Sequence, residues 1–267
     1  MIVELEPEDY HRAAHILEGH RQYVPALSVI YGDFPGRVFV DNSDLPRTAI
    51  VWAISRWAYI EGNADNVDFN TSIAELIRDR IIPGSREIEM SWFELYSNLS
   101  ADWRRTIESA LSEFDCRSHM ESTFVWDRQK YHAFRADYAF PNGFEPVKSD
   151  IPILRASTAR SPFVSDAHKT RTAIGFRVMG ENKIIAQCRS DGLLHGSQFM
   201  IDVETFDETE RRKGLATAAS VALLDFCLEQ SLDPLWEAVK ENLASRGLAQ
   251  KLGFVEDETY PVYGIKF

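Results

Sequence analysis

The sequence has few cysteines and few basic residues, and each shortage excludes a class of protein. Its three cysteines, Cys116, Cys188 and Cys227, are odd in number and far apart in a chain of 267 residues, which argues against a disulfide framework and against paired zinc ligands. Lysine and arginine number 29 against 41 acidic residues, giving a formal net charge of -12. An acidic surface repels nucleic acid phosphates and anionic membranes, so neither is an expected partner, whereas a cationic substrate is favoured.

Long hydrophobic runs and several familiar motifs are missing as well. The most apolar stretch, residues 48–60, is interrupted by Arg56 and is shorter than the roughly 20 residues that span a bilayer. The first residues lack the basic and apolar regions of a secretion signal, so we expect a cytoplasmic protein. Neither G-x-G-x-x-G nor a P-loop occurs, and His11 and His15 lack the glutamate of an H-E-x-x-H zinc site. We therefore expect no metal.

The periodicity of the remaining sequence predicts a mixture of helices and strands in two parts. Pro141-Asn142-Gly143 marks the expected boundary, which gives an N-terminal α/β half, residues 1–140, and a second domain, residues 141–267. The expected helices are residues 8–29, 72–82, 101–114, 214–230 and 245–252. The expected strands are residues 37–41, 48–60, 87–95, 117–126, 172–179, 183–189, 198–205, 235–239 and 262–267. A turn at Gly180-Glu181-Asn182 is expected to join two of these strands into a hairpin.

A basic turn that contains glycine lies between the predicted strand 198–205 and the helix that follows. Gly214 lets the backbone approach a ligand because it has no Cβ atom. The N–H groups of a first helical turn have no acceptor within the helix, and the helix dipole favours an anion there. The three preceding basic residues are unfavourable at a helix N-terminus unless an anion binds. The pattern predicts a site for a diphosphate, although a helix that merely begins after basic residues has the same sequence.

A second motif follows one strand later. Asn242 and Ser245 lie three residues apart, about one helical turn, and precede Leu252-Gly253-Phe254. Asn242 can cap the helix that begins there, or it can donate a hydrogen bond to an amide carbonyl of a ligand. Both interpretations remain open at this point.

Together with Phe226-Cys227-Leu228, Pro234-Leu235-Trp236 and residues 248–254, the two motifs make residues 172–255 resemble the GNAT N-acetyltransferase superfamily, in particular its zwittermicin-resistance-like branch. The resemblance implies an α+β fold, an α/β sandwich in which a mixed β-sheet flanked by helices splays apart to hold acetyl-CoA. Backbone groups near Val203 and Thr205 would bind the pantetheine arm, and the amides that precede the helix would bind the pyrophosphate. The order of elements in residues 1–140 would also suit a degenerate copy of the same fold. The expected cofactor-binding residues are Val203, Thr205, Arg211, Arg212, Lys213, Gly214, Leu215, Ala216, Thr217, Asn242 and Ser245.

Acetyl transfer to an amine requires a base, because a free alkylamine has a pKa of about 10.4 and must lose a proton before it attacks. On strand 198–205, Asp202 and Glu204 alternate with apolar residues, so one face of the strand carries carboxylates. We predict Glu204 as the base and Asp202 as the second candidate. The alternative is that both carboxylates are merely solvated on an exposed face.

The acid that protonates the leaving thiolate is harder to assign. The resemblance implies a tyrosine directly after the leucine of the last helix, but here Leu248 is followed by Ala249. Either Tyr260 or Tyr263 takes that role, or the thiolate leaves unassisted, or the protein is not catalytic. We select Tyr263 as the candidate acid.

These observations predict a cytoplasmic acyltransferase that transfers an acetyl group from acetyl-CoA to the primary amine of a small molecule. The N-terminal half would shape the acceptor pocket, and the protein would be a monomer or a homodimer. The alternative is a regulatory protein of the same fold that binds acyl-CoA without turnover. Ala249 is the feature that keeps this alternative open.

Overall fold

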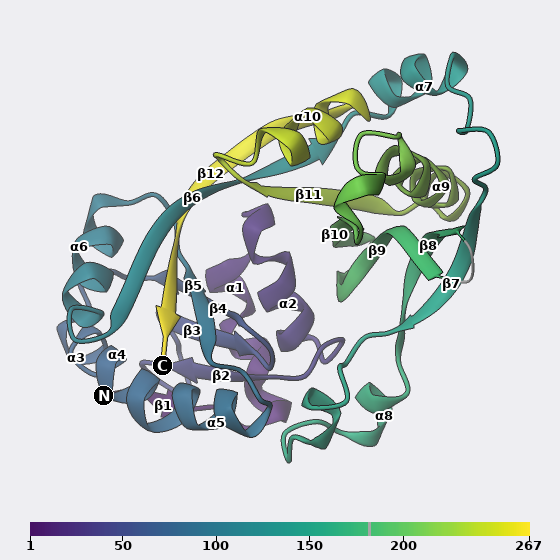
Figure 1. Ribbon diagram of the computed structural model, residues 1–267. Helices are drawn as coiled ribbons and strands as arrows, with labels where there is room; N and C mark the ends of the chain where they lie inside the picture. The colour runs from purple at the N-terminus through teal and green to yellow at the C-terminus, as the bar shows by residue number, and fades with distance from the viewer. Residues whose placement is uncertain (181–182) are drawn as a thin grey trace. The chain divides into compact units, whose positions relative to one another are not determined.

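The computed structural model of the chain describes residues 1–180 and 183–267 (Figure 1). Its internal packing gives two compact units, each discontinuous in sequence: the first contains residues 1–121, 154–169 and 259–267, and the second contains residues 122–153 and 170–258. Strands β6 (Asp115–Trp126) and β12 (Phe254–Lys266) contribute residues to both units. The division into residues 1–140 and 141–267 stays a prediction. The discontinuity was not foreseen, because pairing between strands far apart in the chain leaves no local sequence signal.

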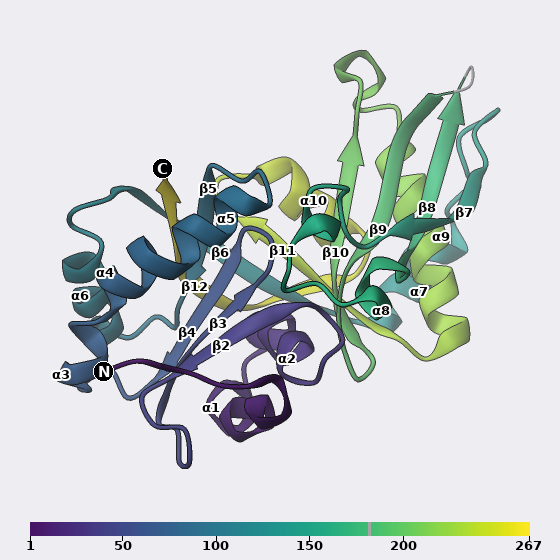
Figure 2. The same cartoon turned by 90° about the horizontal axis from the view of Figure 1, so that it is seen from below.

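The first unit is built on a mixed sheet with the strand order β1-β2-β3-β4-β5-β12-β6. Strands β4 and β5 pair in parallel, from Trp57 opposite Glu94 to Tyr59 opposite Tyr96, whereas the β1–β2, β2–β3, β3–β4 and β5–β12 pairs are antiparallel. The strands are β1 (Val3–Glu4), β2 (Gly36–Val40), β3 (Thr48–Ala53), β4 (Trp57–Gly62) and β5 (Trp92–Tyr96). Figure 2 shows β2, β3 and β4 side by side.

The helices of the first unit differ from the prediction in where they begin and end. The helix expected at residues 8–29 is interrupted at Gly19, whose φ of 100° ends it. The helix expected to stop at Pro83 instead continues, because a proline in a first helical turn removes an N–H group that needs no partner there. The helices are α1 (Ala14–Leu17), α2 (Val24–Ile30), α3 (Val67–Asn70), α4 (Ile73–Leu76), α5 (Ile82–Glu87), α6 (Ala101–Ala110) and α8 (Asp166–Lys169), with a π-helical segment at Ile77–Ile81 between α4 and α5.

The predicted strand 48–60 is wrong as a single element, because it forms the two strands β3 and β4. Both strands are almost entirely buried, so they read as one apolar run in the sequence. The turn between them contains neither glycine nor proline, and the indole N–H of Trp52 donates to the Ser55 carbonyl oxygen at 3.3 Å. Strands β2 and β3 are joined through a turn at Asn42, whose side-chain oxygen accepts from the backbone N–H groups of Asp44 and Leu45, both at 2.9 Å.

The second unit has the strand order β6-β11-β10-β9-β8-β7. Strand β10 is parallel to β11 and antiparallel to β9, while β8 is antiparallel to both β9 and β7. The strands are β7 (Pro146–Pro152), β8 (Thr172–Gly180), β9 (Lys183–His195), β10 (Gln198–Thr205) and β11 (Asp233–Val239). Figure 2 shows β7 to β10 side by side. Glu181 and Asn182 of the predicted hairpin turn lie outside the described residues.

Three helices accompany this sheet: α7 (Arg128–Ala136), α9 (Leu215–Gln230) and α10 (Leu243–Lys251). Residues of α9, α10, β9, β10 and β11 form one apolar core, which includes Ala218, Ala249 and Trp236. Helix α9 is buried on more than one face. The reason is α7, which the sequence analysis missed: the Tyr131 hydroxyl donates to the Val221 carbonyl oxygen of α9 at 3.1 Å. Among the described residues, no helix is both long and apolar enough to cross a membrane.

The two units repeat one order of elements. In the first unit, antiparallel β2, β3 and β4 are followed by helices, then by β5 parallel to β4, then by α6 and β6. In the second unit, antiparallel β8, β9 and β10 are followed by α9, then by β11 parallel to β10, then by α10 and β12. The predicted α+β sandwich with a mixed sheet is confirmed.

Candidate functional site

Strands β10 and β11 separate partway along their length. Their parallel pairing runs from Gln198 opposite Asp233 to Ile201 opposite Trp236 and stops there. Strand β10 nevertheless continues to Thr205 and β11 to Val239. The sheet of the second unit therefore splays open beyond Ile201 and Trp236, as predicted.

The exposed edge of β10 offers backbone hydrogen-bonding groups. Residues 202–205 of β10 pair with β9 on their other side, and the N–H of Phe206 donates to the opposite carbonyl oxygen of Ile185 at 2.9 Å. In an antiparallel pair, residues that bond to the partner alternate with residues that point away. Counting back from Phe206, Glu204 and Asp202 bond toward β9, whereas Thr205 and Val203 direct their N–H and C=O groups toward the opening. This edge can pair with an amide-containing chain.

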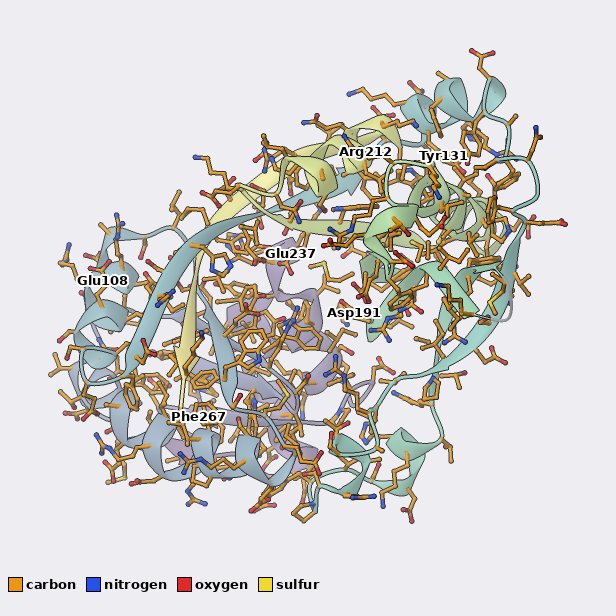
Figure 3. The ribbon with its side chains drawn as sticks, viewed as in Figure 1. Glu108, Tyr131, Asp191, Arg212, Glu237 and Phe267 are labelled. Atoms are coloured by element: carbon orange, nitrogen blue, oxygen red, sulfur yellow. The ribbon has the colours of Figure 1, made fainter. Side chains whose placement is uncertain are left out.

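The turn that leads into α9 has the backbone geometry of an anion site. Arg212 has a φ of 62° and Gly214 a φ of 81°, so two left-handed residues flank Lys213 and turn successive N–H groups into a concave nest. The first bond of the helix is donated by Ala218 to the Gly214 carbonyl oxygen at 2.9 Å, and no side chain caps the helix. Within the described part of the chain, the N–H groups from Arg212 to Thr217 have no protein acceptor. Figure 3 shows Arg212 at this turn.

Acidic neighbours moderate the positive charge of the turn. Arg211 is 3.2 Å from Glu208 and Lys213 is 3.0 Å from Glu210. Ahead of them, Asp207 accepts hydrogen bonds from the Thr209 side chain and backbone, which together with Lys183 lower its pKa to about 2. These local contacts fix the turn, and they leave the backbone N–H groups as its main donors.

Helix α10 begins beside the opening, and its capping interpretation is confirmed. The side-chain oxygen of Asn242 accepts from the Ser245 backbone N–H at 3.1 Å, which satisfies one donor of the first turn. The Ser245 hydroxyl accepts from the indole N–H of Trp236 at 2.9 Å. The amide NH₂ of Asn242 is not used by the cap, so its predicted contact with a ligand is compatible with capping.

The two carboxylates of β10 lie on the face opposite α9. Their neighbours Ile201 and Val203 pack in the core that α9 covers, and side chains alternate along a strand. Asp202 accepts a hydrogen bond from Arg189 at 3.0 Å. Glu204 is exposed, and in the described part of the chain its carboxylate has no hydrogen-bonding partner. Glu204 therefore has no competing ion pair among the described residues, and the roles of both carboxylates stay predictions.

The candidate acids lie in the first unit. Tyr263 is 3% exposed and packs in the apolar core of that unit, where burial, followed by the charge of Glu108, raises its pKa. Tyr260 is also buried, and its ring lies 6.2 Å from that of Tyr96. In the second unit, Ala249 is fully buried. Both candidate acids therefore belong to the first unit. The role of Tyr263 as the acid stays a prediction.

A cluster of ionisable groups in the first unit escaped the sequence analysis. Side-chain atoms of Glu94, His119 and Glu121 lie within 4.8 Å of one another, as metal ligands would. Arg56, 3.5 Å from Glu94, already places a positive charge beside them. Burial raises the pKa of Glu94, opposed by Arg56. His119 and Glu121 are two residues apart on β6, so their side chains are expected on one face of a strand. Nothing in the sequence indicates that Glu94 of β5 lies beside them.

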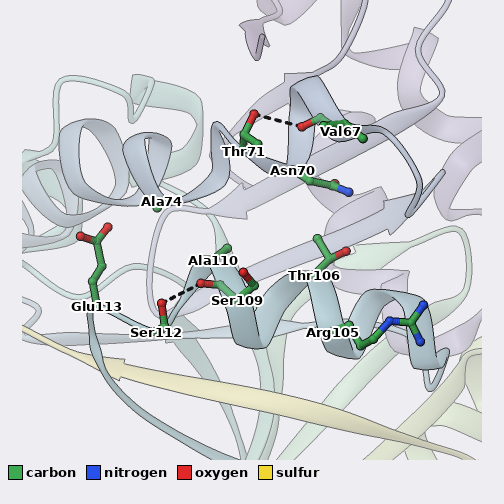
Figure 4. Close-up of a pocket in the computed structure, with 10 residues that line it drawn as sticks. All are labelled: Val67, Asn70, Thr71, Ala74, Arg105, Thr106, Ser109, Ala110, Ser112 and Glu113. Carbon is green, nitrogen blue, oxygen red and sulfur yellow. Dashed lines mark hydrogen bonds between the residues drawn. The ribbon is translucent and has the colours of Figure 1, made fainter.

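The first unit also contains a cavity of about 560 Å³ between helices α3, α4 and α6 (Figure 4). Its hydroxyls bond to their own helices: Thr71 donates to the Val67 carbonyl oxygen at 3.0 Å and Ser112 to that of Ser109 at 2.8 Å. Arg105 and Glu113 form ion pairs with Asp102 and Arg78. These polar groups already have partners, whereas the side-chain oxygen of Asn70 is buried without one among the described residues.

Comparison with known proteins agrees with this geometry. The family model described as GNAT acetyltransferase matches residues 14–263. The chain is 26% identical over 250 residues to the uncharacterized N-acetyltransferase YdfB of Bacillus subtilis strain 168, covering 91% of both chains. Among solved structures, it resembles a GCN5-related N-acetyltransferase-like protein from Streptococcus suis 89/1591, with a TM-score of 0.69, 19% identity and coverage of 97% of this chain and 99% of that one. It also resembles a tandem GNAT protein from the clavulanic acid biosynthesis pathway, with a TM-score of 0.61, 13% identity and coverage of 100% and 98%.

The match to the family model covers most of the chain, and it spans residues of both units. The zwittermicin-resistance-like branch is not distinguished by these comparisons and stays a prediction. Acetyl-CoA use and transferase activity are expected of this family. The chain belongs to the GNAT acetyltransferase family.

Proposed function

We propose that the protein is an N-acetyltransferase that transfers the acetyl group of acetyl-CoA to the primary amine of a small molecule. The observation that carries the proposal is the set of unpaired N–H groups from Arg212 to Thr217, directly beyond an opening between β10 and β11. Such groups at the start of a 16-residue helix favour a diphosphate. A Cβ atom at position 214 would add bulk to this nest, and glycine avoids it.

Each part of the opening suits one part of acetyl-CoA. The turn before α9 would hold the pyrophosphate, and the edge of β10 at Val203 and Thr205 would pair with the amides of the pantetheine arm. Asn242 would donate its amide N–H groups from the other side. When bound, the carrier supplies an acetyl thioester, which an amine can attack without a metal.

The chain's own groups would then manage the proton and the developing charge. Glu204 would accept the proton of the attacking amine, directly or through water. A backbone N–H at the open edge of β10 would donate to the thioester oxygen as negative charge develops there. The carboxylates and the net charge of -12 favour a cationic acceptor. Cytoplasmic location and a monomeric or homodimeric state remain predictions.

We further propose that the first unit is a degenerate copy that binds no cofactor and serves the acceptor. Its β4–β5 pairing also ends early, after Tyr59 and Tyr96, but the buried carboxylate of Glu61 fills the space beyond. It accepts from the Tyr23 hydroxyl at 2.6 Å, from the Asn98 amide at 2.8 Å and from the Gly62 N–H at 2.8 Å.

The helix that follows β4 is also unsuited to phosphate. Helix α3 is already capped, since the Asn66 side chain accepts from the Phe69 N–H at 3.2 Å. Asp65 and Asp68 flank this cap, where the second unit has basic residues. A negative ligand would be repelled there. We expect one acetyl-CoA to bind per chain.

Calorimetry and turnover together test these proposals. Titration with acetyl-CoA should give one site per chain, and a panel of small amines should release free thiol. Glu204→Gln should lower turnover by roughly 10²–10⁴-fold while sparing acetyl-CoA affinity, because it removes only the base. Glu229→Gln, an exposed glutamate at the far end of α9, is the matched control and should change neither.

The outcomes separate the candidate functions. Tight binding without turnover on any amine would favour the regulatory protein that binds acyl-CoA, which the buried Ala249 keeps as a second candidate. Absence of binding at millimolar acetyl-CoA would contradict both. Equal turnover by Glu204→Gln and the wild type would remove Glu204 from the mechanism.

A further inference from the structure

The hydroxyl of Ser245 is held in place but has a proton still to donate. Its oxygen accepts from the Trp236 indole N–H at 2.9 Å, and Trp236 is only 1% exposed in the core of the second unit. Its own backbone N–H is bound by Asn242, so the helical turn is fixed as well. A hydroxyl has one donor and two acceptor positions, and no described protein group accepts its proton. Ser245 is half-buried, so its proton is available to solvent or to a bound ligand.

The position of Ser245 along the opening indicates what that acceptor is. Trp236 is the last residue of β11 that pairs with β10, so its partner Ser245 lies near the point where the strands separate. A carrier whose diphosphate binds at the turn before α9 enters from the carboxyl end of β10. Its pantetheine arm then runs back along Thr205 and Val203, which directs its thioester end toward Ile201 and Trp236.

We propose that Ser245 is a catalytic residue whose O–H donates a hydrogen bond to the thioester sulfur, an inference that rests on the proposed acetyl transfer. The amine nitrogen forms a bond to the acetyl carbon and gives its proton to the base on β10, for which Glu204 and Asp202 are the two candidates. The C–S bond breaks, and its electron pair stays on the sulfur as a thiolate. Serine is a much weaker acid than a thiol, so Ser245 keeps its proton and stabilises the thiolate, which solvent then protonates.

The other positions considered for the acid are less suitable than Ser245. Ala249, one turn further along the same face of α10, has no donor and is fully buried. Tyr263 lies in the apolar core of the first unit. Trp236 is a positioning residue in this scheme, because its N–H occupies one lone pair of Ser245 and orients the O–H.

The test compares the variant Ser245→Ala with the control variant Ser197→Ala. Ser197 directly precedes β10. Ser197 donates to Asp233 at 3.2 Å where β10 and β11 begin to pair, so Ser197→Ala removes an equivalent hydroxyl far from the opening. Ser245→Ala should lower kcat by about 10- to 100-fold, as expected for losing one hydrogen bond to a charged group. Its Kd for acetyl-CoA should stay within about twofold of the wild type, because the interaction strengthens only as the bond breaks.

A measurement without turnover gives an independent result. Ultraviolet absorbance of the thiolate reports the pKa of the thiol in bound coenzyme A. A donor at the sulfur lowers that pKa, so the thiol pKa should rise in Ser245→Ala. The rise in Trp236→Phe should be no larger than the rise in Ser245→Ala. The thiol pKa should stay unchanged in Ser197→Ala.

An unchanged kcat and thiol pKa in Ser245→Ala would overturn the proposal. A weaker Kd at constant kcat would overturn it too, because it would mean that Ser245 binds a pantetheine carbonyl. Failure of the wild type to bind acetyl-CoA would instead refute the proposed function itself.

Discussion

Replacing Gly214 with alanine should weaken both the fold and acetyl-CoA binding. Gly214 has a φ of 81°, where an L-residue costs about 1–2 kcal/mol. A Cβ atom there would meet only the Pro141 side chain, at 3.6 Å, so the cost is backbone strain and not a clash. About 1 kcal/mol corresponds to roughly 2–4 °C in a protein of this size, so the melting temperature without ligand should fall by about 2–8 °C.

The ligand effect follows from the same strain. If the alanine relaxes out of the left-handed region, the N–H groups around it turn away from the phosphates, and we expect Kd to rise at least tenfold. Acetyl-CoA at about 100 times the wild-type Kd stabilises the wild type by roughly 2.7 kcal/mol, and a tenfold weaker Kd reduces this gain to about 1.4 kcal/mol. Differential scanning fluorimetry with and without acetyl-CoA measures both quantities.

Gly247 provides the control for this substitution. It lies within α10 and lacks a positive φ, and a Cβ atom added there would meet nothing within 4 Å. Gly247→Ala should therefore stabilise the fold by about 0.5–1 kcal/mol through helix propensity, with no change in the acetyl-CoA gain. Equal ligand-induced shifts in Gly214→Ala and Gly247→Ala would refute the assignment of the anion site.

Two further substitutions test the cap of α10 and the ionisable cluster of the first unit. Asn242→Ala should cost about 1 kcal/mol in chemical unfolding, because the Ser245 N–H loses its acceptor; Asn242→Ser should restore most of the stability, but acetyl-CoA affinity should stay reduced if the amide binds pantetheine. Burial raises the pKa of Glu94, so its carboxylate destabilises the fold as pH rises from about 4.3, the unfolded value, through that raised pKa. Glu94→Gln should therefore gain stability over the wild type above this window and lose the advantage below it, as urea unfolding at several pH values would show.

Local patterns predicted the elements that position the site. Strand β10 was predicted at its observed bounds, because alternating residues and a following basic turn delimit it. The caps at Ser100 and Asn242 were also recognisable, since each side chain accepts from the backbone three residues later. Helix α7 was missed although Asp127 caps it, because it is only 9 residues long and most of its residues are polar or charged.

Contacts between distant segments could not be predicted from local patterns. Nothing near Glu61 indicates that Tyr23 and Asn98 bond to it, so this buried hydrogen-bond network became visible only in three dimensions. The hydrogen bond between Trp236 and Ser245 likewise joins a strand to a helix. The sequence placed Ser245 in a cofactor-binding motif and Trp236 in a segment that resembles the family, but only their pairing gives Ser245 a defined hydrogen bond.

The shared strand β12 affects how the protein can be synthesised. Its last residues pair with β5, with Val262 opposite Tyr96 and Lys266 opposite Trp92. Strand β12 must therefore leave the ribosome before the sheet that contains β5 can be completed. Such sequence-distant pairing slows folding and leaves β5 with an open edge in the nascent chain. Loss of residues 262–266 would consequently damage a sheet whose other strands are translated much earlier.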